Sequence, residues 1–123
     1  MKHIFKFLVL IIFTQTSFAQ NFDKNLVSKK TELNLSFESK MRGIESKNVV
    51  YYIEKDIQTL SAYENGKLKW QTNIISVCGK PSVGKPEIRV IKPQADKLLI
   101  VFGKHSFAEV DIKNGKTEYL GED

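Results

Sequence analysis

The sequence predicts an all-β fold of about eight mostly antiparallel strands, set in two four-stranded, blade-like units that pack as a sandwich or as a partial propeller or barrel. Three observations favour this class. Apolar and polar residues alternate along several segments, Asn-Gly pairs stand between such segments, and the chain resembles itself at an offset of 49 positions. No segment after residue 19 shows a sustained helical period with capping residues, so we expect little helix.

The start of the chain has the pattern of a secretory signal peptide. A basic beginning is followed by an uninterrupted apolar run over residues 7–13, and small residues stand at Ser17 and Ala19, as a cleavage site requires. The apolar run is shorter than the roughly 20 residues that a membrane-spanning helix needs. We therefore expect residues 1–19 to be a signal peptide, and the remainder to be periplasmic or secreted with no membrane span.

Residues 20–123 have the length of a single domain. Their only cysteine is Cys78, so no internal disulfide can form and apolar packing must stabilise the fold. The whole chain carries a formal charge of +5; without Lys2 and Lys6, 17 Lys and Arg face 14 Asp and Glu, which leaves +3. Lysines are interleaved with acidic residues and arginines are few, so the composition does not predict nucleic-acid binding.

The first half of the domain predicts a polar arm followed by four strands. Residues 20–30 lack a clear period, so we expect a loose leader or a short extended arm. The segments that follow are alternating or uninterruptedly apolar over the length of a strand. They cover residues 33–38, 48–53, 57–63 and 67–75.

The last two of these strands are expected to form a hairpin. Asn65 and Gly66 stand between them, and both residue types tolerate the positive φ that a tight turn demands. In the final strand, Leu68, Trp70 and Ile74 are expected on one face, because successive side chains of a strand point to opposite sides.

The offset of 49 positions aligns residues 48–73 with residues 97–122 without a gap. The two Asn-Gly pairs coincide, and the apolar run "VVYYI" falls on "LLIVF". A turn and an apolar run that stay in register are typical of a structural repeat. We therefore expect an internal repeat over about residues 31–77 and 86–122.

The segment "VDIKNGKTEY", and more loosely "LSAYENGKLKW", resembles the repeat of quinoprotein-type or PQQ-like β-propellers. In that repeat a strand ends in an Asp-containing turn to Gly-Lys, and the next strand carries an aromatic residue. The spacing matches from Asp111 to Gly115, whereas the first copy departs from it at its acidic residue. The resemblance implies β-blade structure. It implies no bound quinone, and no cofactor is expected.

The inner strands of both units need cover on both faces. In "VVYYI" and "LLIVF" consecutive residues are apolar, so each strand carries apolar side chains on both sides. Two blades cannot close a propeller, which has about four to eight. Three alternatives stay open for the outer cover: residues 22–41, curling into a barrel-like closure, or a second copy of the protein in a homo-oligomer.

The connection between the two units is the least periodic part of the domain, and "GKP" occurs in it twice. Lys80 and Lys85 stand beside glycines whose N–H groups could cradle an anion, and Arg89 follows. Proline after each lysine differs from a phosphate-binding loop, so an ordinary linker is the alternative. His105 and the aromatic Phe107 in the next turn complete the candidate ligand-binding residues.

Cys78 and His105 suggest a second kind of site, because a histidine within hydrogen-bond reach of a thiol would activate it as a nucleophile. The alternatives for Cys78 are a small buried residue at a strand end and an intermolecular disulfide. A single histidine after the signal peptide, with no carboxylates clustered near it, argues against a transition-metal site.

These observations predict an exported, non-catalytic binding or interaction module whose partner is a protein or a cell-surface polymer. The alternative is a small secreted thiol-dependent enzyme that uses Cys78 with His105.

Overall fold

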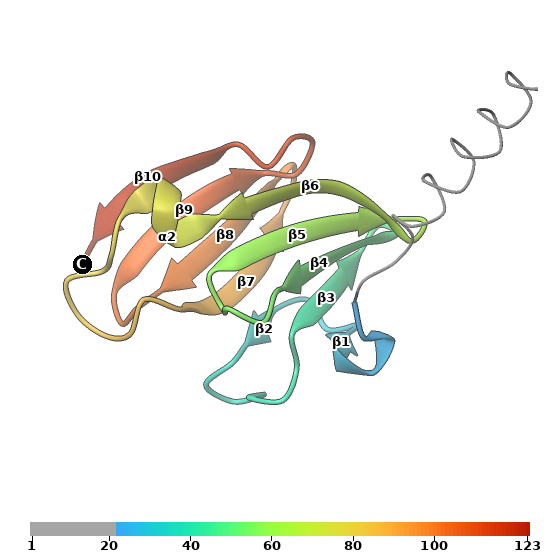
Figure 1. Ribbon diagram of the computed structural model, residues 1–123, viewed down its shortest axis with the longest axis horizontal. Coiled ribbons are helices and arrows are strands. Elements are labelled where there is room, and N and C mark those ends of the chain that lie inside the picture. The colour runs from blue at the N-terminus through green and yellow to red at the C-terminus, as the bar shows by residue number, and fades with distance from the viewer. Residues whose placement is uncertain (1–21) are drawn as a thin grey trace, which may run out of the picture.

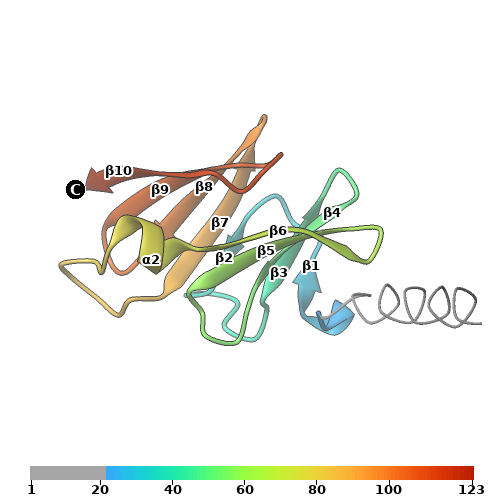
Figure 2. The same cartoon turned by 45° about the horizontal axis from the view of Figure 1, so that its top comes forward.

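The computed structural model describes residues 22–123, and the predicted signal peptide lies outside them. The described residues form two five-stranded sheets that are mostly antiparallel, which confirms the predicted all-β class. Neither sheet closes into a barrel within this part of the chain. Figures 1 and 2 show the sheet of the N-terminal half beside the sheet of the C-terminal half and inclined to it.

The first sheet has the strand order β1-β3-β4-β5-β6. Its last four strands follow one another along the chain as an antiparallel meander, and β1 pairs with β3 in parallel. The strands are β1 (Val27–Ser28), β3 (Gly43–Ser46), β4 (Val49–Ile53), β5 (Thr59–Glu64) and β6 (Lys67–Asn73).

The second sheet has the order β10-β9-β8-β7-β2 and is antiparallel throughout. Four of its strands again form a meander, while β2 comes from the N-terminal segment and pairs with β7. The strands are β2 (Leu33–Asn34), β7 (Ile88–Gln94), β8 (Lys97–Phe102), β9 (Ser106–Asp111) and β10 (Thr117–Glu122).

Two short helices occur among the described residues, η1 (Lys24–Leu26) and α2 (Ile74–Cys78). The sequence pattern predicts that the last strand of the first meander extends to residue 75. This prediction is wrong. The strand ends at Asn73, whose side chain accepts a hydrogen bond of 3.0 Å from the Ser76 N–H and caps α2. Ile74 is buried in the core, but it belongs to α2 and not to a strand. Neither helix has the length and apolar character needed to cross a membrane.

The predicted strand over residues 33–38 is also wrong beyond Asn34. The Asn34 side chain accepts a hydrogen bond from the Ser36 N–H, and its backbone carbonyl accepts from both Phe37 and Glu38. An Asn that bonds the backbone two residues ahead offers the chain a turn in place of a strand ladder. The segment turns away from the sheet, and Phe37 is 86% exposed.

A β-bulge changes which face of the first sheet the side chains of β6 point to. Trp70 pairs with Ala62 and Leu68 pairs with Tyr63, so the strand carries one extra residue between them. Leu68 therefore shares the outer face with Tyr63, whereas Trp70 faces the core. The extra residue explains why Leu68 is 47% exposed and Trp70 only 7%.

The two Asn-Gly pairs occupy corresponding hairpins, each joining the third and fourth strands of a meander. Asn65 and Gly66 both have positive φ, as the tight turn requires. The second hairpin is longer and packs on the first sheet: the Trp70 Nε1–H donates to the Ile112 carbonyl at 2.8 Å, and the Thr72 hydroxyl donates to the Gly115 carbonyl at 2.8 Å. These bonds join one end of the two sheets.

Both sheets contribute to a single apolar core. Residues 0% exposed come from each sheet and from α2; they include Leu33, Ile44, Ile53, Leu60, Ile74, Ile91, Leu98, Ile100 and Val110. Leu35 and Met41, from the N-terminal segment, pack against this cluster.

The N-terminal segment also covers the outer face of the first sheet. The Phe22 ring lies 4.8 Å from the Tyr63 ring and 5.7 Å from the Tyr52 ring, measured between centroids. On the second sheet, Phe107 lies directly opposite Val101, which is 8% exposed. Side chains of the same chain thus cover much of the apolar surface that the two-faced strands carry.

Candidate functional site

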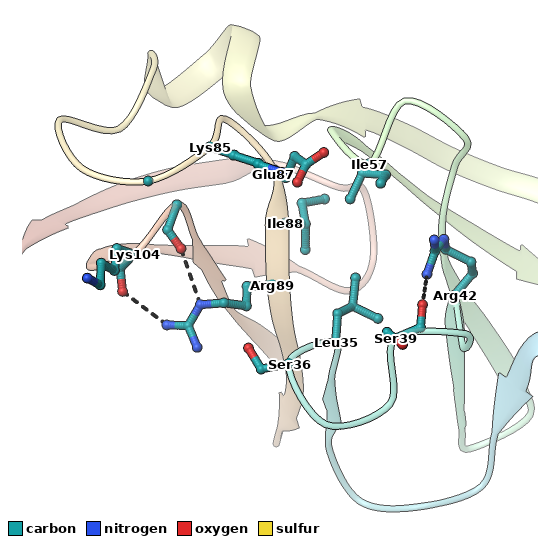
Figure 3. A pocket seen from close by; sticks show the side chains of 12 residues that line it. Leu35, Ser36, Ser39, Arg42, Ile57, Lys85, Glu87, Ile88, Arg89 and Lys104 are labelled. Atoms are coloured by element: carbon teal, nitrogen blue, oxygen red, sulfur yellow. Dashed lines mark hydrogen bonds between the residues drawn. The ribbon is translucent and has the colours of Figure 1, made fainter.

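A groove of about 370 Å³ opens where the two sheets meet (Figure 3). Its walls come from the loop between β2 and β3, the loop between β4 and β5, and the second sheet with the linker that precedes it, residues 79–87. The lining residues are Leu35, Ser36, Ser39, Arg42, Ile57, Gly84, Lys85, Glu87, Ile88, Arg89, Gly103 and Lys104. This volume lies at the lower end of the range for small-molecule sites.

The floor of the groove is apolar. Leu35, Ile57 and Ile88 lie in its middle (Figure 3). The Ile88 N–H donates to the Ile57 carbonyl at 2.7 Å, and the Leu35 N–H donates to the Arg89 carbonyl at 2.8 Å. Main-chain hydrogen bonds between the two halves of the domain and the N-terminal segment therefore hold the three apolar side chains of the floor in place.

Ile57 has a strained backbone, with φ at 58°. A β-branched residue in this left-handed region is a genuine outlier, and such strain is concentrated at functional sites. The surrounding turn holds the conformation, because the Asp56 carboxylate accepts from the Gln58 and Thr59 N–H groups and from the Thr59 hydroxyl. These bonds hold the pKa of Asp56 below its ordinary value although burial opposes the shift.

Four cationic side chains and one carboxylate line the groove, which leaves a net charge of +3. Arg42 lies on one side of the apolar floor, and Arg89 and Lys104 lie on the other (Figure 3). Lys85 belongs to the second group. The carboxylate belongs to Glu87, which directly precedes Ile88 in the chain. The excess of positive charge next to apolar atoms suits a ligand that is anionic and partly apolar.

The two arginines are fixed by backbone carbonyls. Arg89 donates from Nε to the Gly103 carbonyl at 3.2 Å and from Nη2 to the Lys104 carbonyl at 3.0 Å. Arg42 donates from Nη1 to the carbonyls of Ser39 and Met41, at 2.8 and 2.7 Å. Both guanidinium groups are therefore held in place before any ligand arrives, which lowers the entropy cost of binding.

The linker forms one wall of the groove and packs tightly on the turn after β8. The Lys104 N–H donates to the Val83 carbonyl at 2.9 Å, and the Gly103 N–H donates to the Glu87 carbonyl at 3.0 Å. A Cβ atom on Gly84 would stand 2.6 Å from the Lys104 nitrogen, so only glycine allows this approach.

Glu122 ties the same linker to the last strand. Its Oε1 accepts from the Ser82 N–H at 3.0 Å and from the Ser106 hydroxyl at 3.2 Å. The bonds from Ser82 lower the pKa of Glu122, and the nearby His105 adds to this effect.

The structure brings together two of the five predicted ligand-binding residues, since Lys85 and Arg89 both line the groove. Lys80 is exposed on the linker, His105 lies in the turn after β8, and Phe107 lies on the outer face of β9; these three are not among the lining residues. The two "GKP" copies therefore contribute differently, because only the second has its lysine at the groove.

Cys78 lies at the end of α2, half-buried against the core. Burial raises the pKa of its thiol, which is the opposite of what a thiolate nucleophile needs. No hydrogen bond joins Cys78 to His105 among the hydrogen bonds of residues 22–123. Within the same residues, no three His, Cys, Asp or Glu side chains come together as metal ligands would.

Sequence reasoning missed Arg42, Ile57 and Lys104 as groove residues. Arg42 has a usable signal in the sequence, because Arg42 and Arg89 are the two arginines of the chain. Ile57 and Lys104 had no such signal, since their positions at the groove depend on how the two sheets meet.

A second cavity of about 290 Å³ lies on the other side of Arg42, lined by Asp23, Leu26, Arg42, Tyr52, Ile53, Glu54 and Lys55. Glu54 is engaged there by the Tyr63 hydroxyl, which donates to Oε2 at 2.9 Å. Burial, with this bond and the charge of Glu54, raises the pKa of Tyr63 to about 12. The mixed charges of this cavity make it a less selective site for anions than the groove.

Comparison of the chain with protein-family models, curated proteins and solved structures found no match.

Proposed function

We propose that the protein is an exported, non-catalytic binding module that holds a small anionic ligand with an apolar portion in the groove between its sheets. The observation that carries this proposal is the lining of the groove, with four cations against one carboxylate around a floor of Leu35, Ile57 and Ile88. A protein or a cell-surface polymer recognised in this way would have to present a carboxylate or phosphate next to apolar atoms.

The arrangement of the charges supports binding in preference to catalysis. The lysines and arginines can hold an anion, but they cannot easily exchange a proton near neutral pH. Glu87 could accept a hydrogen bond from a hydroxyl or amino group of the ligand. The proposed export is supported by the pattern of residues 1–19 alone.

We further propose that the two meanders are copies of one β-blade unit, as the resemblance to the quinoprotein-type repeat implies. Support comes from the strand order, since β3 to β6 and β7 to β10 each form a four-stranded antiparallel meander with an Asn-Gly pair in its last hairpin. No cofactor is part of this proposal.

Octanoate is a suitable probe for the proposed function, because it joins one carboxylate to an apolar chain. Titrated into the isotopically labelled protein, it should shift the amide resonances of residues 35–42, 84–89 and 103–104 in a saturable manner. Lys85→Gln should weaken the binding because the Lys85 ammonium is lost from the groove. Lys116→Gln removes the same charge from an exposed loop outside the lining and should leave the affinity unchanged.

Two results would contradict the proposed function. Octanoate shifts spread over the surface without saturation, or equal weakening by Lys85→Gln and Lys116→Gln, would mean that the groove is not a binding site.

A further inference from the structure

We infer that the ligand carries two anionic groups separated by an apolar middle, and that it bridges the two sheets. This inference rests on the proposed function and narrows it from any small anion to a bipolar one, such as a dicarboxylic acid.

The cations of the groove belong to two different sheets. Arg42 directly precedes β3, and its backbone is fixed within the first sheet: its N–H donates to the Leu26 carbonyl at 2.8 Å and its carbonyl accepts from the Ile53 N–H at 2.6 Å. Arg89 lies on β7, and its side chain is hydrogen-bonded to carbonyls of the turn after β8. A ligand that reaches both groups must therefore cross the junction of the sheets.

The junction itself offers no positive charge. Ile57, from the loop between β4 and β5, and Ile88, from the second sheet, meet there through a main-chain hydrogen bond of 2.7 Å, and Figure 3 shows them between Arg42 and Arg89. Glu87 directly precedes Ile88 and also lines the groove, and its carboxylate would repel an anionic group placed next to it. The charge pattern along the groove is thus positive, apolar and positive.

Each end keeps donors for a ligand. Arg42 uses only Nη1 in its bonds to the Ser39 and Met41 carbonyls, so Nε and Nη2 make no hydrogen bond among the described residues. At the other end, the ion pairs within residues 22–123 involve neither Lys85 nor Lys104. One carboxylate at each end would form charge-assisted hydrogen bonds, which are the strong kind.

A comparison of octanedioate with octanoate tests this inference, because the two probes have the same chain length and differ in the second carboxylate. Dissociation constants are measured by calorimetry at neutral pH and low salt. Octanedioate should bind at least about tenfold more tightly, since its second carboxylate binds at a high effective concentration. Dicarboxylates of six to ten carbons should show an optimum length, because a rigid pair of anchors fits one spacing best.

Variants of Arg42 separate its charge from its role in the loop. Arg42→Gln should abolish the preference for octanedioate, so that both probes bind with similar affinity. Arg42→Lys loses the bonds from Nη1 to the Ser39 and Met41 carbonyls but keeps the charge, and should retain most of the preference. Lys116→Gln is the matched control and should change neither dissociation constant.

The outcomes distinguish this inference from the proposed function. Saturable octanoate binding that octanedioate does not improve would overturn the bipolar ligand and leave an anion-binding groove. The absence of saturable binding for both probes would overturn the proposed function as well. A tenfold preference for octanedioate that persists in Arg42→Gln would show that neither carboxylate binds at Arg42, which also overturns the inference.

Discussion

At the scale of single residues, Ile57 shows how the groove is tied to backbone strain. Its side chain forms part of the floor, and its carbonyl accepts the hydrogen bond that joins the sheets. Both depend on a φ of 58°, which costs an L-residue about 1–2 kcal/mol. The fold therefore spends part of its stability on placing this one residue.

Substitutions at Ile57 should reverse the usual order of alanine and glycine. Ile57→Gly relieves the strain, whereas Ile57→Ala keeps it after losing most of the same side chain. We expect the glycine variant to have the higher free energy of unfolding, by about 1 kcal/mol, in urea denaturation. At the neighbouring Gln58, whose φ is not positive, the alanine variant should be the more stable. A more stable Ile57→Ala would show that the turn is not strained.

The candidate residues of the site were only partly predictable at this scale. Lys85 and Arg89 could be selected because they stand in an aperiodic segment rich in glycine and proline. Arg42 follows the predicted strand over residues 33–38, and Lys104 lies within the turn between β8 and β9. Their convergence depends on packing between distant segments, which no local pattern contains.

At the scale of elements, the N-terminal segment belongs to both sheets. β1 extends the first sheet and β2 extends the second, and the turn between β2 and β3 supplies Leu35, Ser36 and Ser39 to the groove. The predicted strand over residues 33–38 would place Leu33 and Phe37 on one face with similar burial. The observed turn after Asn34 instead leaves Leu33 at 0% and Phe37 at 86% exposure.

Alanine substitutions at these two positions should therefore differ strongly. Leu33→Ala opens a cavity in the core and should lower the free energy of unfolding by about 2–5 kcal/mol. Phe37→Ala should change it by no more than about 0.5 kcal/mol, because the ring makes little contact with the protein. Thermal or urea denaturation measures both. Similar losses for the two variants would support the continuous strand.

The elements that the sequence pattern predicted well are those decided by local period. The apolar runs of β4 and β8 and the turn at Asn65-Gly66 are where the sequence pattern predicts them. The errors arise where a single residue changes the path: Asn34 starts a turn, Asn73 caps a helix, and one extra residue in the β5–β6 pair moves Leu68 to the outer face. None of these three local features interrupts the spacing of the apolar residues, so the apolar pattern alone does not reveal them.

At the scale of the whole molecule, the two sheets act as one folding unit. They share one core, and hydrogen bonds join them at both ends, from Trp70 and Thr72 at one and between Ile57 and Ile88 at the other. The two meanders are therefore not a pair of independent domains, because each lacks cover for its inner face when alone.

Unfolding should accordingly be cooperative. Trp70 is the only tryptophan and lies at the contact between the sheets, so its fluorescence reports on that contact, while far-ultraviolet circular dichroism reports on all strands. The two signals should have the same urea midpoint and the same slope, as in a two-state transition. A fluorescence transition that precedes the loss of circular dichroism would show that the sheets separate before they unfold.

The position of β2 affects the order in which the protein can fold. Leu33 and Asn34 complete the edge of a sheet whose other strands begin at Ile88, so more than fifty residues must be made before they meet their partner. A ribosome releases the chain from its N-terminus, and the early segment must wait, unpaired, for the late one. Pairing between distant segments is slow. Leu33 and Asn34 therefore cannot pair within the second sheet until β7 has been made.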